Sequence, residues 1–100
     1  MARTPEGKVK DAVKAYLKSV WGAWFFMPVS NGMGKHGVPD FIVCVRGVFI
    51  GVECKAPGKV DAATKLQLRQ HEAIRASGGL VYVVDSVDML HELMCRDLLP

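Results

Sequence analysis

The sequence predicts an α/β domain in which helices flank a central mixed sheet. Two runs rich in β-branched residues, 41–45 and 48–54, are separated by a tight turn and indicate a hairpin. Apolar residues recur at helical spacing over residues 9–20, which indicates an amphipathic helix before the strands. A second helical stretch and a buried strand follow the hairpin. Helices and strands therefore alternate around one sheet.

The first helix begins with a recognisable start signal. Thr4 is the expected N-cap, Pro5 takes the first helical position and Glu6 lies in the first turn. We expect Gly22 to end this helix. Residues 24–29 then predict a short aromatic strand, and the proline within it indicates a sheet edge or a strand end.

The second half of the chain continues the alternation. A second helix is expected from about residue 62 to residue 77, where Gly78-Gly79 stops it. Residues 80–84 predict a buried strand, and Ser86 caps a last short helix that reaches about Cys95. The expected order is α-β-β-β-α-β-α, in one domain that covers all 100 residues.

Composition limits the classes of function. The net charge of +3 permits a polyanionic partner without requiring one. The apolar stretch of residues 21–29 is far shorter than the roughly 20 residues of a membrane span, so no membrane partner is expected. The three cysteines are widely spaced and form no CxxC pair, which predicts a reducing compartment. The chain has neither a P-loop nor a GxGxxG motif, and no small-molecule cofactor is expected.

The predicted hairpin brings two carboxylates and a lysine to one end of the sheet. If it turns on Arg46-Gly47, Asp40 lies directly opposite Glu53, and opposed residues project from the same face. Lys55 is two residues beyond Glu53, so it lies on that face too. Two carboxylates held this close repel each other, and a divalent cation relieves that repulsion. The hairpin end is therefore a predicted metal site.

Glu6 is a third acidic candidate. On a helical projection it falls at the centre of the apolar arc of the first helix, and a buried carboxylate needs a partner. Alternatively, Glu6 only complements the helix dipole at an exposed first turn. The predicted metal site nearby favours a role as a ligand.

The order Pro39-Asp40, then Glu53-Cys54-Lys55, resembles the PD-(D/E)XK nuclease superfamily and, more narrowly, its stand-alone phage and bacterial VRR-NUC branch. Gly37-Val38, Gln67 on the helix after the lysine, and the strand entry at residues 78–84 add to the resemblance. It covers nearly the whole chain. It implies a restriction-endonuclease-like core with α-β-β-β-α-β order.

The resemblance also implies a mechanism. Asp40, Glu53 and the backbone carbonyl of Cys54 would hold Mg²⁺ or Mn²⁺, with Glu6 contributing directly or through a water. The implied catalytic residues are Asp40, Glu53, Lys55 and Gln67. Lys55 would position or help deprotonate the attacking water and offset charge on the phosphate. Gln67 would orient the lysine or the water.

The glycine-rich loop of residues 30–39 is a candidate DNA contact. Its glycines let backbone N–H groups approach phosphates, and Asn31, Lys35 and His36 can hydrogen-bond to them. The alternative is a plain connector. His36 by itself is expected to be a solvated loop residue and not a catalytic base.

A lysine stripe on the first helix is the other candidate DNA contact. The stripe consists of Lys10, Lys14 and Lys18, which recur every four residues. It forms either a solvated face of the helix or a surface that binds the phosphate backbone of duplex DNA. His71 and His91 lie on polar stretches and are expected at the surface.

The cluster of large aromatic side chains is expected in the core or, alternatively, at a dimer contact. Its members are Trp21, Trp24, Phe25 and Phe26.

The function that the resemblance implies is a divalent-metal-dependent DNA endonuclease. So small a chain has little surface for reading sequence, so structure-selective cutting of a four-way (Holliday) junction or other branched DNA is expected. A homodimer would present two sites to two strands. The alternatives are a non-catalytic nucleic-acid-binding module and a non-specific or restriction-type nuclease. The expected location is the cytoplasm of a bacterium or of a phage-infected host.

Overall fold

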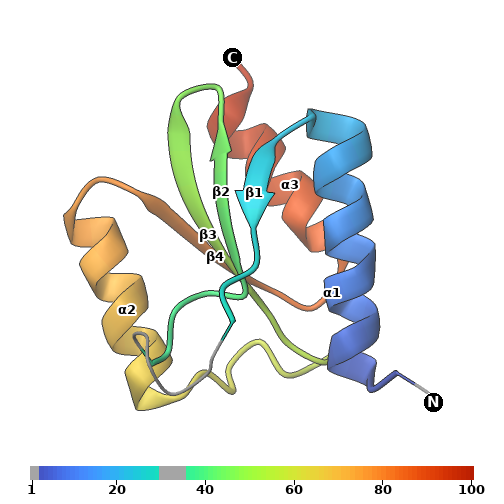
Figure 1. Cartoon of the computed structure of the whole chain (residues 1–100), viewed down its shortest axis with the longest axis vertical. Helices are drawn as coiled ribbons and strands as arrows, with labels where there is room; N and C mark the ends of the chain where they lie inside the picture. Colours follow the sequence, from blue (N-terminus) through green and yellow to red (C-terminus); the bar gives the residue numbers. More distant parts are fainter. Residues whose placement is uncertain (1–2, 30–35) are drawn as a thin grey trace.

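The fold is a four-stranded mixed sheet between helices, as described by a computed structural model for residues 3–29 and 36–100. The elements are α1 (Pro5–Tyr16), η1 (Leu17–Trp21), β1 (Trp24–Phe26), β2 (Phe41–Val45), β3 (Val48–Cys54), α2 (Lys65–Ala76), β4 (Leu80–Val84) and α3 (Val87–Leu98) (Figure 1). The strands lie in the order β1-β2-β3-β4, with β3 and β4 parallel and the other pairs antiparallel. The predicted mixed α/β fold is confirmed.

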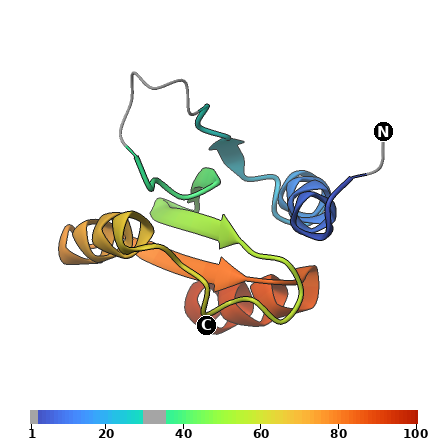
Figure 2. The same ribbon diagram turned by 90° about the horizontal axis from the view of Figure 1, so that it is seen from below.

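The helices divide between the two faces of the sheet. α1 and α3 lie together on one face, and α2 lies on the other (Figure 2). In Figure 1 the first turns of α1 and α2 lie at the same lower end of the molecule as the start of β2. Groups carried by these segments are therefore brought to one end of the sheet.

The first helix starts and stops where the sequence predicts, but its last turn is wider. The Thr4 hydroxyl accepts the backbone N–H of Gly7 at 3.0 Å. The α-helix ends at Tyr16, and η1 continues as a π-helical turn. Gly22 then stops the chain in the left-handed region, with φ of 59°.

The π-helical turn places an aromatic side chain against the preceding turn. The indole N–H of Trp21 donates to the Tyr16 hydroxyl at 2.6 Å. The same hydroxyl lies 2.7 Å from Nδ1 of His91 on α3. His91 is exposed, as predicted, and these contacts tie α1 to α3.

The hairpin has the predicted turn and register. Arg46-Gly47 has two positive φ angles, 52° and 76°, which is the type I′ geometry that matches strand twist. Its ladder runs from Val45 opposite Val48 to Phe41 opposite Val52. The prediction of a turn centred on these two residues is confirmed.

Three boundaries differ from the predictions. β1 ends at Phe26, short of the predicted end at residue 29. α2 begins at Lys65 because the Thr64 side chain caps it there. α3 continues to Leu98, about one turn beyond the predicted end.

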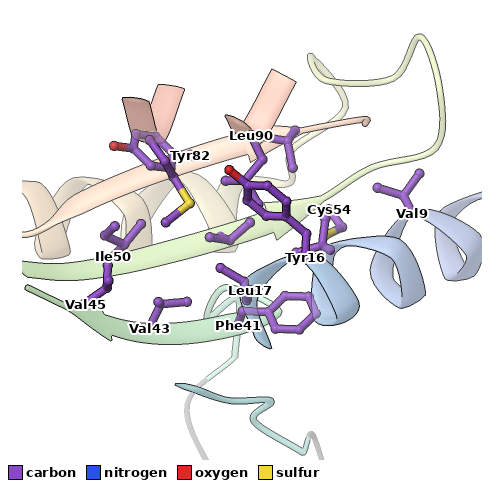
Figure 3. Packing of buried hydrophobic residues seen from close by; sticks show 14 residues of the cluster. Val9, Tyr16, Leu17, Phe41, Val43, Val45, Ile50, Cys54, Tyr82 and Leu90 are labelled. Atoms are coloured by element: carbon purple, nitrogen blue, oxygen red, sulfur yellow. The ribbon is translucent and has the colours of Figure 1, made fainter. Parts of the chain in front are cut away.

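The core lies between the sheet and the α1–α3 layer (Figure 3). Its buried side chains are Val9, Val13, Tyr16, Leu17, Phe41, Val43, Val45, Ile50, Val52, Cys54, Tyr82, Val84, Leu90 and Met94. This layer fixes α1 against the hairpin. No helix in the part of the chain that the structure describes is long and apolar enough to cross a membrane.

Candidate active site

The open end of the β2–β3 hairpin carries the two predicted carboxylates. Asp40 directly precedes β2, and the ladder continued by one pair sets it opposite Glu53 on β3. Oδ2 of Asp40 accepts the backbone N–H of Cys54 at 2.8 Å, which fixes the orientation of that carboxylate. Glu53 is 2% exposed, whereas Asp40 is half-buried.

Two glycines let the segment before Asp40 pack closely. Gly37 has φ of 81°, and a Cβ there would lie 2.5 Å from the carbonyl of Leu66 at the start of α2. A Cβ on Gly51 would lie 2.7 Å from the ring of Pro39. Side chains at either glycine would push this segment away, so the close packing of residues 37–39 against α2 and β3 depends on both.

Gln67 connects the lysine to the buried carboxyl group. Lys55, which is buried, donates from Nζ to Oε1 of Gln67 at 2.9 Å. Nε2 of Gln67 donates to Oε2 of Glu53 at 3.2 Å. The backbone N–H of Thr64 also donates to Oε1 of Gln67, at 2.9 Å, and completes a capping box. Because Oε1 accepts two N–H groups, Nε2 must face Glu53.

Burial and the nearby charge of Asp40 favour the protonated form of Glu53. Burial, followed by the charge and hydrogen bond of Asp40, raises the pKa of Glu53 to about 8, against the opposing effect of Lys55. Burial and the same carboxylates raise the pKa of the Cys54 thiol to about 12. At neutral pH the protein alone therefore keeps Glu53 largely protonated, and the thiol stays neutral.

Lys10 lies at the site and not on an open basic face. Its Nζ is 3.4 Å from Oε2 of Glu6 and 3.4 Å from Oδ1 of Asp40. Although burial acts in the opposite direction, these carboxylates raise the pKa of Lys10 above its usual value. The predicted third acid, Glu6, is only half-buried and reaches Asp40 through this lysine.

The prediction that His71 lies at the surface is wrong. The side chain is 1% exposed, and its Nε2 lies 3.7 Å from Oε1 of Glu53. Burial, then the charges of Arg75 and Lys55, lower the pKa of His71, so the imidazole is neutral at pH 7. The available sequence signal was its spacing, four residues after Gln67, which puts both side chains on one helix face.

Comparison with known proteins agrees with this geometry. No family model matches the chain. The curated protein named "Putative nuclease p44", from Acyrthosiphon pisum secondary endosymbiont phage 1, is 47% identical over 57 residues. That match covers 56% of this chain and 59% of the relative, so the chain spans less than two thirds of the relative's length. A solved VRR_NUC domain is 29% identical and superposes with a TM-score of 0.71, covering 95% of this chain and 99% of that domain. The chain therefore has a fold that matches a VRR-NUC nuclease domain.

The site has the donors that a hard divalent cation takes. Within residues 3–29 and 36–100, no three His, Cys, Asp or Glu side chains gather into a ready-made metal cluster. Mg²⁺, however, commonly binds through one or two carboxylates, with water and substrate oxygens completing its shell. The opposed carboxyl groups of Asp40 and Glu53 can provide these two carboxylate ligands. Lys10 already places a positive charge beside the Asp40 carboxylate, at 3.4 Å.

The predicted aromatic cluster divides between core and surface. Trp21 and Phe25 are partly buried and pack against the core, as predicted. Trp24 and Phe26 are 62% and 48% exposed, so their placement in the core was wrong. The ring centroids of these two residues are 5.7 Å apart in a T-shaped arrangement. Both residues lie on β1, the edge strand of the sheet. The alternative of an intermolecular contact remains for these two side chains.

The predicted DNA contacts fall partly within the described residues. Asn31 and Lys35 lie outside them. His36 is exposed, and so are Lys14 on α1 and Lys18 on η1. These three side chains are accessible to a ligand, whereas Lys10 is engaged by carboxylates.

Proposed function

We propose that this chain, whose fold matches a VRR-NUC domain, hydrolyses DNA phosphodiester bonds with the help of Mg²⁺ or Mn²⁺. The observation that carries the proposal is the hydrogen-bonded series Lys55–Gln67–Glu53 beside Asp40. A buried lysine held by a neutral amide, next to paired carboxyl groups, combines a cation site with a fixed donor. The nuclease named among the relatives supports the same reading.

The proposed roles of the site residues are consistent with the hydrogen bonds that they make in the protein alone. Asp40, Glu53 and the carbonyl of Cys54 would hold the cation, with Glu6 close enough to contribute through a water. The cation supplies polarisation of the phosphate and a lowered pKa for a bound water. Gln67 restrains Nζ of Lys55, so the lysine can hydrogen-bond to the attacking water and stabilise charge developing on the phosphate.

A cleavage assay with a matched lysine control tests the catalytic proposal. Wild type, Lys55→Met and Lys59→Met are incubated with labelled DNA and Mg²⁺, Mn²⁺ or EDTA. Lys59 is an exposed lysine close in sequence, so its loss should leave cutting unchanged. We expect Lys55→Met to slow cleavage about 100-fold or more, as removal of a charge-stabilising donor does. Cutting in EDTA would contradict metal dependence, and DNA binding without cutting would indicate a non-catalytic binding module.

We propose further that the substrate is branched DNA and that the active form is a homodimer. The exposed Trp24 and Phe26 on an edge strand offer a contact between copies. Two copies would bring two sites to two strands of a junction. The assay therefore includes single-stranded, duplex, flap and four-way-junction DNA. Paired, symmetric cuts on the junction are expected, whereas equal cutting of every substrate would remove the branched-DNA proposal.

We place this activity in the cytoplasm of a bacterium or a phage-infected host, because the relative with the nuclease name comes from a phage. Fractionation of cells that produce the chain at native levels would test this, with the cytoplasmic fraction expected to contain it.

A further inference from the structure

α2 presents two polar side chains, one helical turn apart, to a single carboxyl group. Nε2 of Gln67 donates to Oε2 of Glu53 at 3.2 Å. Nε2 of His71 faces the other oxygen, Oε1, at 3.7 Å. Residues four apart lie above one another on a helix, so one rigid element addresses both oxygens of the carboxyl group.

Only one of these two contacts with Glu53 is a hydrogen bond. The Gln67 contact is a hydrogen bond, whereas the His71 distance is longer than one. Oε1 of Glu53 and Nε2 of His71 are both buried, and neither has a hydrogen-bond partner among the described residues. Buried polar atoms are nearly always paired, and a donor and an acceptor that face each other without contact need an explanation.

We infer that His71 is a positioning residue for Glu53, whose Nε2–H closes onto Oε1 when the carboxylate binds a divalent cation. The inference rests on the proposed metal-dependent function. With Gln67 on one oxygen and His71 on the other, the carboxylate cannot rotate, and its remaining lone pairs face the cation at a fixed angle. Partners of this kind, which contact a ligand and not the metal, typically change metal affinity 10- to 100-fold.

The first test measures cation binding without DNA. Mn²⁺ affinity is determined by calorimetry and by electron paramagnetic resonance for wild type, His71→Leu and His71→Gln. We expect His71→Leu to weaken Mn²⁺ binding about tenfold or more. His71→Gln keeps an N–H donor and should recover most of that loss. His91→Leu, at a histidine bonded to Tyr16 away from the site, should bind Mn²⁺ like wild type.

The second test separates positioning from simple support of the fold. In EDTA, His71→Leu should melt at the same temperature as wild type or higher, because leucine removes a buried nitrogen that lacks a partner. A purely structural histidine predicts a lower melting temperature and normal Mn²⁺ affinity in the folded fraction. That result would overturn the inference, as would a glutamine variant that folds but does not restore affinity.

The outcomes also separate this inference from the proposed function. A wild type that cuts DNA, together with a His71→Leu variant that binds Mn²⁺ normally, would refute the role of His71 and leave the nuclease. A wild type whose Mn²⁺ affinity depends on both His71 and Glu53 but that cuts no DNA would refute the nuclease and leave the positioning role. A wild type that binds no divalent cation would refute both.

Discussion

The ammonium group of Lys10 lies between carboxylates from two elements, 3.4 Å from Glu6 and 3.4 Å from Asp40. A fixed positive charge there competes with a divalent cation. For Lys10→Met we expect Mn²⁺ to bind roughly threefold more tightly, because a partly exposed ion pair contributes a few tenths to about 1 kcal/mol. Calorimetry compares it with Lys14→Met, one turn further along α1. Weaker binding in Lys10→Met would instead mean that the lysine holds Asp40 in its binding orientation.

Glu53 should make the stability of the protein alone depend on pH. Its pKa in the folded chain, about 8, lies above the usual value of 4.5, so the folded state binds the proton more tightly than the unfolded state. Stability contributed in this way falls as pH rises through that window. Below about pH 6.5 the lowered pKa of His71 acts in the opposite direction, so pH 6.5 to 8 isolates Glu53.

The prediction concerns thermal melts in EDTA between pH 6.5 and 8.5. We expect the melting temperature of wild type to fall across this range and that of Glu53→Gln to stay nearly constant, because the amide does not titrate. Addition of Mn²⁺ should reverse the wild-type trend, since a ligating carboxylate must lose its proton. A wild-type melting temperature that rises with pH would contradict the raised pKa.

At the scale of elements, the start of α2 serves both the fold and the site. Thr64 caps the helix, and Gln67, the third residue of the helix, returns a hydrogen bond to Thr64 while holding Lys55. Thr64→Ala should cost about 1 kcal/mol of stability, as N-cap losses do, and should also slow cleavage because Gln67 is less restrained. Ser86→Ala removes the equivalent cap of α3, which lies on the opposite face of the sheet from α2.

Urea unfolding and single-turnover cleavage of the two cap variants form the test. Both should lose similar stability, and only Thr64→Ala should lose rate when both are folded. Equal rates in the two variants would show that the cap has no part in catalysis.

The sequence was sufficient for the hairpin because its information is local. Gly47 suits the positive φ that a type I′ turn requires, and a two-residue turn on Arg46-Gly47 sets Asp40 opposite Glu53. The burial of His71 depends instead on how α2 packs over the sheet, and its polar neighbours in the chain point to the opposite conclusion. Only tertiary contacts distinguish such a residue from a surface histidine.

Trp24 and Phe26 show the reverse error. Large aromatic side chains usually lie in a core, yet β1 is an edge strand, and α2, on the same face as these rings, packs on β4 at the opposite edge of the sheet. Strand order is a property of the whole sheet, which a single run of residues does not contain. The start of α2 was missed for a smaller reason, because helix ends depend on which capping group engages.

At the scale of the whole molecule, the two faces of the sheet are covered unequally. The ladders place Trp24 beside Cys44 and Cys44 beside Phe49, in a row across three strands. All three are exposed, and Phe26 extends the row toward the site. Contiguous apolar surface of this kind is typical of an interface.

We therefore expect the chain to sediment as a dimer at micromolar concentration. Replacing Trp24 and Phe26 together by serine should shift it toward monomer, because the contact area is largely theirs. Leu68→Ser, at an exposed leucine on α2, is the control and should leave the dimer unchanged. Sedimentation equilibrium provides the measurement. A wild type that stays monomeric would contradict the homodimer, whatever its activity.

The tight turn at the hairpin tip has a consequence for insertions and deletions. Surface turns usually accept extra residues, and this one lies roughly 17 Å from Glu53 at about 3.3 Å per strand residue. One residue added to one strand just before the turn, however, would slip the pairing by one and send Asp40 or Glu53 to the opposite face of the sheet. We expect a chain lengthened by one residue there to lose activity if the turn itself is kept, and a chain with two extra residues in an enlarged loop to keep it. The turn at one end of the hairpin thus sets the strand register that brings the two carboxyl groups together at the other end.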